Sequence, residues 1–375
     1  MKIFKINESI KKKTINIIGT RGIPARYGGF ETFAEKLSLY LVKKKWVVNV
    51  FCQEFGKSKP SKMKWNGINL IRIPVNFKGP LSTIIFDFKS ALISSHIKGL
   101  CLTLGYNTAI FNIFQKFKKQ KNIFNMDGIE WKRDKWNFFI KVWFYLNQNI
   151  AAILGDHLIA DNPHIKNFIT NKYNKKKISM IPYGAEKFTK PNKNILSKFR
   201  LKPKKYSIVI ARPEPENSIL EIVESFVSKK RNHQLVIFGK FEPTKNTYHK
   251  KILEVSNSEV IFVGAIYEKK VLSTLRHYCK LYIHGHTAGG TNPSLVEALG
   301  SGCVILANNN KFNKWTLGKN GFYFRNKKQC GSQFDILLDK DLKIYAKKNY
   351  KRFLKKFQWK YILQNYEKLF LKILS

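Results

Sequence analysis

The sequence predicts an α/β protein made of two doubly wound Rossmann-like domains with an interdomain cleft. Short apolar runs alternate with segments whose apolar residues recur at helical spacing. This alternation occurs once before and once after a Lys- and Pro-containing segment at residues 186–205. Alternating strands and helices form parallel sheets with right-handed crossovers. The 375 residues are also enough for about two domains of ordinary size.

The first alternation gives the βαβ unit of a parallel sheet. A buried strand is expected at residues 15–18, a helix with one apolar face at 30–41, and a second strand at 47–51. A further strand is expected at residues 157–160.

The second alternation follows residue 205. The expected strands are at residues 206–211, 235–238, 260–263, 281–284 and 304–307, and the expected helices at residues 216–230, 271–279 and 293–299.

The predicted division is an N-terminal domain at residues 1–185, a C-terminal domain at 186–350 and a C-terminal helix at 351–375. That helix has Phe353, Phe357, Tyr361, Leu369 and Phe370 as apolar anchors. It is expected to cross back onto the first domain, or else to lie on an anionic membrane face.

Aromatic residues crowd the segment after Asp127. The simplest interpretation is an amphipathic helix packed on the sheet, while some of the aromatic side chains could line a cleft or touch a bilayer surface. They are Trp131, Trp136, Phe138, Phe139, Trp143, Phe144 and Tyr145.

The net charge of +45 favours anionic partners, including nucleic acid, acidic lipid and phosphorylated ligands. Lysines are spread along nearly the whole chain, together with many Asn and Ile residues, as an AT-rich coding sequence would produce. We interpret the charge partly as such compositional drift and partly as attraction to a membrane.

Targeting and cysteine patterns favour a cytoplasmic protein. The 5 cysteines form no CxxC pair, which argues against a zinc site or a disulfide framework. No signal peptide is expected in MKIFKINESIKKK, and no transmembrane helix is expected elsewhere.

Three candidate loops each follow a predicted strand and precede a helix. The first is GTRGIPARYGGFET at residues 19–32, in which Gly28 and Gly29 could present backbone N–H groups at a helix N-terminus to an anion. Arg21 and Arg26 would add positive charge. The alternative is a tight turn that needs glycine for its backbone angles.

The second loop is HGHTAGGTNPSLVEA at residues 284–298, in which Asn292 is a good helix N-cap. Gly289, Gly290 and Thr291 could offer N–H groups to a phosphate. Glu297 could bind ribose hydroxyls, because a buried Glu without a partner would be costly. The pair His284 and His286 lacks a third ligand at suitable spacing, so no metal site is expected.

The third loop is ARPEPEN at residues 211–217. Arg212 could bind a phosphate through two hydrogen bonds. Glu216 and Asn217 could instead simply begin the next helix. Together the three loops favour a nucleotide diphosphate as ligand.

These three segments, with NMDGIEWKR at residues 125–133 and FQWKYILQNYEKLF at 357–370, resemble the bacterial rhamnosyltransferase-like branch of glycosyltransferase family four. The resemblance covers nearly the whole chain. It implies a GT-B fold, with an acceptor-side N-terminal domain and a nucleotide-sugar-binding C-terminal domain. It further implies transfer with retention of anomeric configuration and no requirement for a metal or other cofactor.

The donor implied by the resemblance is a nucleotide sugar, dTDP-L-rhamnose above all, with UDP- or GDP-linked sugars as alternatives. The acceptor would be a polyprenyl-diphosphate-linked saccharide of cell-envelope polysaccharide synthesis. The protein would then be peripheral on the inner face of the cytoplasmic membrane.

Matching positions give the implied site. Gly29 would face the donor phosphate, Arg212 the diphosphate and Glu297 the ribose. The donor-binding set is Gly28, Gly29, Phe30, Arg212, Asn217, Gly289, Gly290, Thr291, Asn292, Ser294, Leu295 and Glu297.

Two positions depart from the family pattern. Gly289 replaces the first Glu of the usual E-x7-E motif, and Asn217 replaces the lysine that commonly follows the phosphate-binding arginine. Both changes remove polar contacts to the sugar, which fits a 6-deoxy sugar.

On the acceptor side, Asp127 is the candidate that orients or deprotonates the acceptor hydroxyl, with Glu130 as a weaker candidate and Arg21 and Arg26 nearby. Asp127 could instead be a turn residue before Gly128. Asp127 and Arg212 are the predicted catalytic residues, and Arg212 would stabilise the charge on the departing phosphate.

Two other classes of protein are less compatible with the sequence. A nucleic-acid-binding protein would fit the charge, but no helix-turn-helix, zinc-finger or RNP pattern is present, so no specific nucleic acid is expected. An epimerase would need a dinucleotide fingerprint with Tyr-x-x-x-Lys, and a phosphorylase a pyridoxal-phosphate lysine. Neither stands in a suitable setting.

Overall fold

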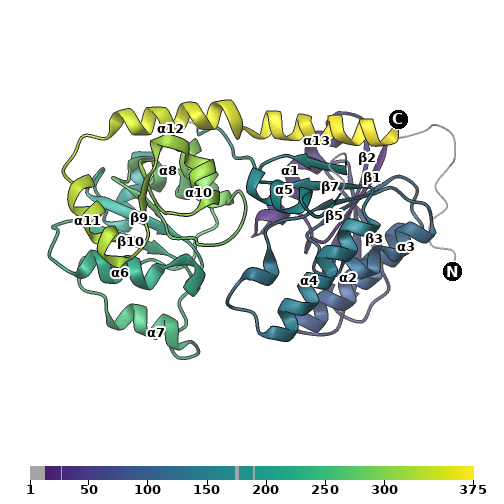
Figure 1. Ribbon diagram of the computed structural model, residues 1–375, viewed down its shortest axis with the longest axis horizontal. Coiled ribbons are helices and arrows are strands. Elements are labelled where there is room, and N and C mark those ends of the chain that lie inside the picture. The colour runs from purple at the N-terminus through teal and green to yellow at the C-terminus, as the bar shows by residue number, and fades with distance from the viewer. Residues whose placement is uncertain (1–12, 27, 174–176, 189–190) are drawn as a thin grey trace.

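The computed structural model describes residues 13–26, 28–173, 177–188 and 191–375. The chain forms two α/β halves that lie side by side, with two helices running along one edge of both (Figure 1). Residues 1–12, where the sequence predicts no signal peptide, lie outside the described residues. Within the described residues no helix is long and apolar enough to cross a membrane.

The first half contains a sheet in the order β3-β4-β2-β1-β5-β6-β7-β8, in which only the β3–β4 pair is antiparallel among the described strands. Its strands are β1 (Thr14–Ile18), β2 (Val47–Phe55), β3 (Ser61–Trp65), β4 (Ile68–Val75), β5 (Leu100–Leu104), β6 (Asn122–Asn125), β7 (His157–Ala160) and β8 (Ile178–Met180). Its helices are α1 (Gly29–Lys43), α2 (Gly79–Ser95), α3 (Ile113–Phe117), α4 (Phe138–Leu154) and α5 (Pro163–Thr170), with 3-10 turns η1 (Ala109–Asn112) and η2 (Glu130–Lys132).

The second half contains a parallel sheet in the order β11-β10-β9-β12-β13-β14. Its strands are β9 (Tyr206–Ile210), β10 (Gln234–Phe238), β11 (Val260–Phe262), β12 (Tyr282–His284), β13 (Ile305–Asn308) and β14 (Phe322–Phe324). Its helices are α6 (Ile219–Val227), α7 (Thr247–Glu254), α8 (Lys269–Tyr278), α9 (Pro293–Gly300), α10 (Lys311–Leu317) and α11 (Lys327–Leu337), with 3-10 turns η4 (Lys193–Phe199), η5 (Pro215–Asn217) and η6 (Gly318–Asn320).

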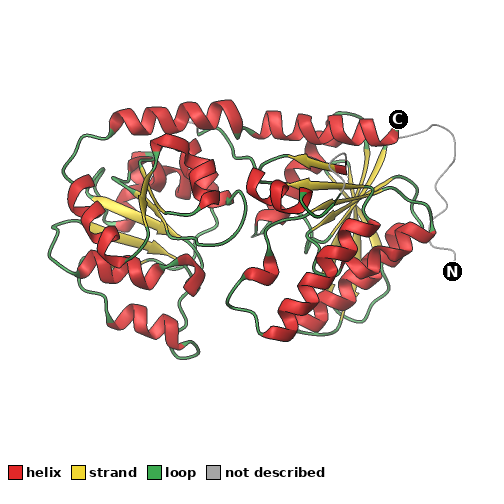
Figure 2. Cartoon of the chain, viewed as in Figure 1, coloured by secondary structure: helices red, strands yellow, loops and turns green. Residues whose placement is uncertain are grey.

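Helices cover both faces of each sheet (Figure 2). Because strand order reverses at β1 in the first sheet and at β9 in the second, the loops after β1 and β5, and those after β9 and β12, diverge at these switch points. Ligands of open parallel sheets bind at such points, beyond the carboxyl ends of the strands. The predicted α/β class with two doubly wound sheets is therefore confirmed.

Some local predictions differ from the structure, among them the single helix expected at residues 351–375, which is divided between α12 (Lys343–Lys356) and α13 (Trp359–Leu374). The helix expected at residues 216–230 begins only at Ile219, because a 3-10 turn at Pro215–Asn217 precedes it and Ser218 has a φ of 49°. A positive φ of this kind cannot continue an α-helix. The segment at 186–205 is not only a connection between the two halves but also part of the second half, since Leu196 and Leu201 are buried in its core.

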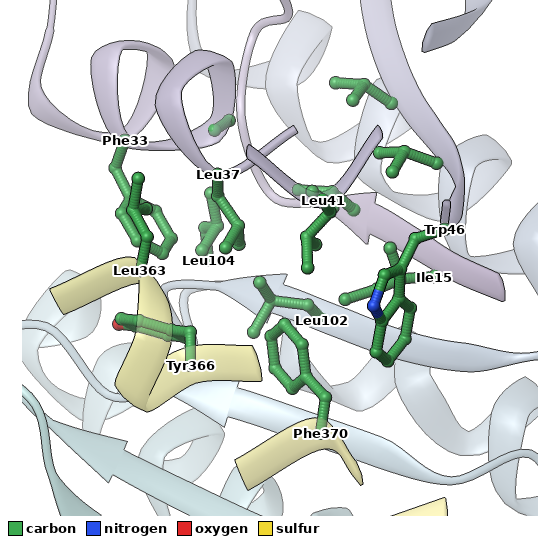
Figure 3. Close-up of a cluster of buried hydrophobic side chains, with 14 of the residues drawn as sticks. Ile15, Phe33, Leu37, Leu41, Trp46, Leu102, Leu104, Leu363, Tyr366 and Phe370 are labelled. Atoms are coloured by element: carbon green, nitrogen blue, oxygen red, sulfur yellow. The ribbon is translucent and has the colours of Figure 1, made fainter. Parts of the chain in front are cut away.

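The chain ends in α12 (Lys343–Lys356) and α13 (Trp359–Leu374). Phe353 and Phe357 belong to the core of the second half, whereas Trp359, Tyr366 and Phe370 belong to that of the first. Figure 3 shows Leu363, Tyr366 and Phe370 of α13 facing α1 and the first sheet. The apolar face of α13 is thus covered by protein and is not available to a membrane.

Tyr361 is a correction to the expected set of anchors in this helix. Its side chain is 46% exposed, on the side of α13 away from the core. Periodicity around Ile362 and Tyr366 rather than around Tyr361 therefore defines the buried face.

The two chain crossings between the halves are bound to each other. Ala185 donates its N–H to the Phe357 carbonyl at 2.8 Å, and the Trp359 N–H reaches the Ala185 carbonyl at 3.3 Å. Gly184 is required beside them, because a Cβ there would lie 2.6 Å from the Trp359 ring. The segment that leaves the first half at Ala185 and the segment that returns to it at Gln358 therefore cross between the halves at the same place.

Phe370→Ala should lower the free energy of unfolding by about 3–5 kcal/mol, because it removes a fully buried ring from the first core. Urea denaturation measures this change. Tyr361→Ala on the exposed side of the same helix is the matched control and should change stability by no more than about 0.5 kcal/mol. Equal effects of the two substitutions would contradict the packing of α13 described above.

Candidate active site

The three predicted loops meet where the two halves touch, and the third is joined to the second because the Thr287 N–H donates to the Glu216 carbonyl at 2.9 Å. A Cβ at Gly29, the first residue of α1, would lie 3.1 Å from the Pro293 ring at the start of α9. A Cβ at Gly128 would lie 3.3 Å from the Gly289 Cα. Loops after β1 and β6 of the first sheet therefore contact the loop after β12 of the second, and glycines allow this close approach.

Carboxylates of α1 organise the first loop. Glu31 accepts hydrogen bonds from the Arg21 N–H at 3.1 Å and the Thr20 hydroxyl at 3.3 Å. Gly28 has a φ of 91°, and a Cβ there would lie 2.1 Å from a Glu31 carboxylate oxygen. Glycine is therefore required at position 28 by its backbone angle and by the nearby Glu31 carboxylate, whether or not a ligand binds here.

The other predicted residues of this loop separate into two groups. Arg21 and Arg26 are exposed, whereas Phe30 packs against the core of the first half. A Cβ at Gly105 would lie 3.5 Å from the Phe30 ring. The Phe30 side chain therefore faces the first core.

The second loop is braced by its own side chains. Asn292 caps α9 by accepting the Ser294 N–H at 3.0 Å, as its N-cap position predicts. The Ser294 hydroxyl donates to the Ile210 carbonyl at 3.2 Å. Leu295 is completely buried in the second core, so its side chain cannot reach a ligand and only its backbone could contribute.

Glu297 has a partner that the sequence did not reveal, which corrects the premise of its assignment. The buried Arg276 of α8 binds its carboxylate at 2.6 Å, with the guanidinium 5.9 Å from the Tyr282 ring centre. Glu297 remains 37% exposed at its side chain, so the ion pair holds the carboxylate in place while leaving part of it accessible. Arg276 is thus a site residue that sequence reasoning missed.

The third loop has one exposed arginine whose guanidinium could bind an anionic ligand. Arg212 is exposed, and within the described part of the chain its guanidinium has no acidic partner. Asn217 is buried and donates its side-chain amide to the Arg212 carbonyl at 2.8 Å, which makes it a brace for the loop. Glu216 forms ion pairs across the interface with Arg133 at 3.6 Å and Lys135 at 3.7 Å.

The predicted acceptor-side residues lie on a loop held by Tyr106. The Tyr106 hydroxyl donates to the Gly128 carbonyl at 3.1 Å and accepts the Glu130 N–H at 2.8 Å. Asp127 has a φ of 48°, a left-handed conformation that Asp and Asn tolerate better than most residues. Glu130 is buried and pairs with Arg133 at 3.1 Å.

Asp161, which the sequence analysis missed, joins the two halves at this place. Its carboxylate accepts the Thr291 N–H at 2.8 Å, and its carbonyl accepts the Thr291 hydroxyl. A Cβ at Gly290 would overlap the same carboxylate, so glycine there is required for the contact. The other carboxylate oxygen is buried without a hydrogen-bond partner in the structure.

Three carboxyl groups at this interface bind protons unusually tightly. Burial raises the pKa of Asp161 to about 7, and the nearby Asp127 raises it further. Burial and then Asp127 raise the pKa of Glu130 to about 7, while Arg133 opposes the shift. Burial also raises the pKa of Asp127. Such clusters of perturbed acids are typical of functional sites.

The two histidines after β12 stack on each other rather than pointing at a common ligand. The ring centres of His284 and His286 lie 4.2 Å apart with an interplanar angle of 7°. Burial lowers the pKa of His286 to about 3, and Arg212 and Arg133 lower it too. In the described part of the chain no group of three or more metal-binding side chains comes together.

Asp161→Asn should change how stability depends on pH. The folded pKa of about 7 lies above the ordinary 3.8, so the folded protein binds a proton that the unfolded chain releases between these values. The free energy of unfolding of the native protein therefore falls as pH rises through this window. The variant keeps an acceptor for Thr291 and should be more stable by about 1–3 kcal/mol at pH above 7, the range for a buried unpaired group.

Thermal and urea unfolding across pH measure this effect. Below the unfolded pKa of Asp the two proteins should be equally stable. The control Asp339→Asn, at an exposed position, should leave the pH profile unchanged. A variant profile parallel to that of the native protein would contradict a protonated Asp161.

Family models match both halves of the chain. Residues 192–358 match the model described as "Glycosyl transferases group 1", and residues 12–186 match one described as "Domain of unknown function (DUF1972)". An uncharacterized glycosyltransferase of Methanocaldococcus jannaschii is 24% identical to the chain, over 93% of this chain and 96% of the relative.

Solved glycosyltransferase structures share the fold. Sucrose-phosphate synthase from Thermosynechococcus elongatus superposes with a TM-score of 0.78 at 15% identity, covering 97% of this chain and 99% of that one. HepE from Anabaena, in complex with UDP-glucose, superposes with a TM-score of 0.73 at 14% identity, covering 97% of this chain and 99% of that one. The second half therefore carries a domain that matches the group 1 glycosyl transferases, and the two halves together adopt the GT-B fold.

Proposed function

We propose that the protein is a retaining glycosyltransferase that moves L-rhamnose from dTDP-L-rhamnose to a lipid-diphosphate-linked saccharide in cell-envelope polysaccharide synthesis. The observation that carries the proposal is the exposed Arg212, which has no acidic partner among the described residues and stands beside loops that meet at the interface. A group 1 glycosyl transferase domain on the same half supports it.

On the donor side, the proposal assigns the diphosphate to Arg212 and to the backbone N–H groups around Gly289 and Gly290. The N-termini of α1 and α9 face the same region, and their dipoles favour a phosphate there. Glu297 would bind the ribose hydroxyls, with Arg276 fixing the carboxylate.

The transfer itself needs stabilisation of the leaving group. The acceptor hydroxyl oxygen bonds to the anomeric carbon on the face that the phosphate leaves, and the bond from that carbon to the phosphate oxygen breaks. The hydroxyl proton passes to Asp127 or to the departing phosphate. The departing phosphate takes up negative charge, which Arg212 and the two helix dipoles would stabilise. The proposal assigns no step to a metal or other cofactor.

On the acceptor side, Asp127 would orient or deprotonate the hydroxyl. Its raised pKa, caused chiefly by burial, makes it a stronger base than an ordinary Asp once it is ionised. Glu130 is the weaker candidate because Arg133 already holds its carboxylate. Arg21 and Arg26, exposed on the loop after β1, would meet the anionic part of the acceptor.

The choice of sugar rests on what the loops lack. Gly289 has no carboxylate that could bind the sugar, and the side-chain amide of Asn217 already donates to the Arg212 carbonyl. A 6-deoxy sugar needs fewer polar contacts than a sugar that keeps its 6-hydroxyl group. The alternative donor is a UDP- or GDP-linked sugar, and it is supported by the similar HepE structure from Anabaena, which holds UDP-glucose.

A peripheral position on the inner face of the cytoplasmic membrane completes the proposal. The net charge of +45 attracts anionic lipids, and the acceptor would be anchored in the same surface.

Turnover assays with dTDP-L-rhamnose, UDP-sugars and GDP-sugars against a panel of lipid-diphosphate acceptors test this function. We expect product only with dTDP-L-rhamnose. Product with another donor would reject rhamnose but keep the reaction class. If no nucleotide sugar binds in calorimetry, the proposed reaction is wrong.

Asp127→Asn should lower the rate of transfer about 10²–10⁴-fold, the usual contribution of a general base, without changing the affinity for the nucleotide sugar. Asn also tolerates the left-handed backbone at this position, so the fold should be retained. Single-turnover rates and donor titrations measure the two quantities.

The matched control is Asp134→Asn in the same segment, where the side chain is fully exposed and faces Lys141 at 3.9 Å. It should transfer sugar at the native rate. Loss of donor affinity in Asp127→Asn would instead assign Asp127 a structural role.

A further inference from the structure

The outer face of α4 is apolar although it is exposed. Phe138 is 72% and Phe139 81% exposed at the start of the helix. Val142, Leu146 and Ile153 continue the exposed stripe along the helix, at the three- and four-residue spacing of one helical face. The opposite face packs in the core through Phe144 and Ala151. A helix that is apolar on both faces normally has a partner on each.

Neighbouring elements extend this surface. Ile110 of η1 and Ile113 and Phe117 of α3 are exposed, Phe117 to 76%. The η1 turn is fixed to α4, because the Ile110 N–H donates to Asn147 at 3.0 Å. Figure 1 places α2, α3 and α4 together on one side of the first half. We call the exposed apolar side chains of η1, α3 and α4 the apolar face.

The charges around the apolar face are mostly positive, with Asp134 as an exposed acid near its start that faces Lys141. Between Asp87 and Asp127 the sequence contains no Asp or Glu, and α4 contains none either. Lys116, Lys118 and Lys119 are exposed directly beside Phe117. Exposed aromatic rings bordered by lysines match the interfacial region of an anionic bilayer, where rings enter the headgroup boundary and lysines meet phosphates.

A second copy of the chain fits this surface less well. A two-fold contact would bring the same lysine-bordered surface of both copies together, and neither residues 88–126 nor α4 contain an acidic residue to neutralise these lysines. The net charge of +45 on each copy adds to that repulsion.

The apolar face also lies close to the interface between the halves. Arg133, which contacts Glu216 of the second half, precedes Phe138 by five residues. Five residues span at most about 18 Å of extended chain. The exposed phenylalanines at the start of α4 are therefore near the loop that carries Asp127.

We propose that the apolar face docks in the interfacial region of an anionic phospholipid bilayer, with Phe138 and Phe139 inserted and the α3 lysines on the headgroups. The inference rests on the proposed function for its purpose, since a bilayer at this place would deliver a lipid-anchored acceptor to the loop at Asp127.

Sedimentation of the purified full-length chain with phosphatidylcholine vesicles, with and without phosphatidylglycerol, tests the docking. We expect binding to the anionic vesicles that weakens in high salt. The double variant Phe138→Ser and Phe139→Ser should bind the vesicles at least about tenfold more weakly than the native chain, because two exposed rings no longer enter the bilayer. Lys118→Glu with Lys119→Glu should weaken binding to anionic vesicles only.

Tyr267→Ser, at a 65% exposed aromatic residue of the second half, is the control and should bind as the native chain does. Circular dichroism should show all variants folded. The proposal would be overturned if the double phenylalanine variant bound as tightly as the native chain. It would also be overturned if the native chain did not bind anionic vesicles. A concentration-dependent dimer that the phenylalanine variant abolishes would overturn it in favour of self-association.

The docking test uses no nucleotide sugar, so its outcome is independent of the reaction. Transfer to a water-soluble acceptor should be equal in the native chain and the phenylalanine variant, whereas transfer to acceptor in vesicles should fall. Loss of both activities would overturn a docking role for these residues. Absence of transfer in the native chain with vesicle binding intact would reject the proposed function alone.

Discussion

The return of the chain through α13 is the constraint on which the rest of the structure depends. Trp359, Tyr366 and Phe370 complete the core of the first half, although they follow the whole second half in sequence. Hydrogen bonds from Tyr40 and Trp46 to Glu367 add polar contacts at the edge of the same core. The first half therefore has its full core only when the chain has passed through the second, and the loops that meet between them are positioned by this exchange.

The interface combines close backbone contacts with buried acids. Glycines at 128, 289 and 290 allow the loops to touch, and Asp161 enters the space this leaves. Burying a carboxylate is costly unless it is neutralised or paired. Arg133 pairs with Glu130, but Asp161 has only a backbone N–H, so its proton is held up to about pH 7. Contact between the halves is thus coupled to proton binding.

Sequence patterns predicted the fold class and the places where the loops begin, because both depend on local periodicity and on residues that end strands. They could not predict contacts between distant residues. Asp161 and Thr291 are 130 positions apart, and no local pattern links them. Arg276 precedes Glu297 on a different helix, so Glu297 looked unpaired. The aromatic segment was ambiguous for a related reason: α4 is apolar on its buried and its exposed faces, and only packing distinguishes them.

The paired crossings at Ala185 and Gln358 also restrict how the two halves can move. Two separate connections would allow sliding and twisting, but these are joined by backbone hydrogen bonds and a parallel bridge. Neither can shift along its axis without breaking those bonds. The pair therefore favours rotation about this one place over sliding, and such a rotation would open the interface more widely with increasing distance from it. Gly128 and Gly289, which touch across the interface, would separate through that rotation.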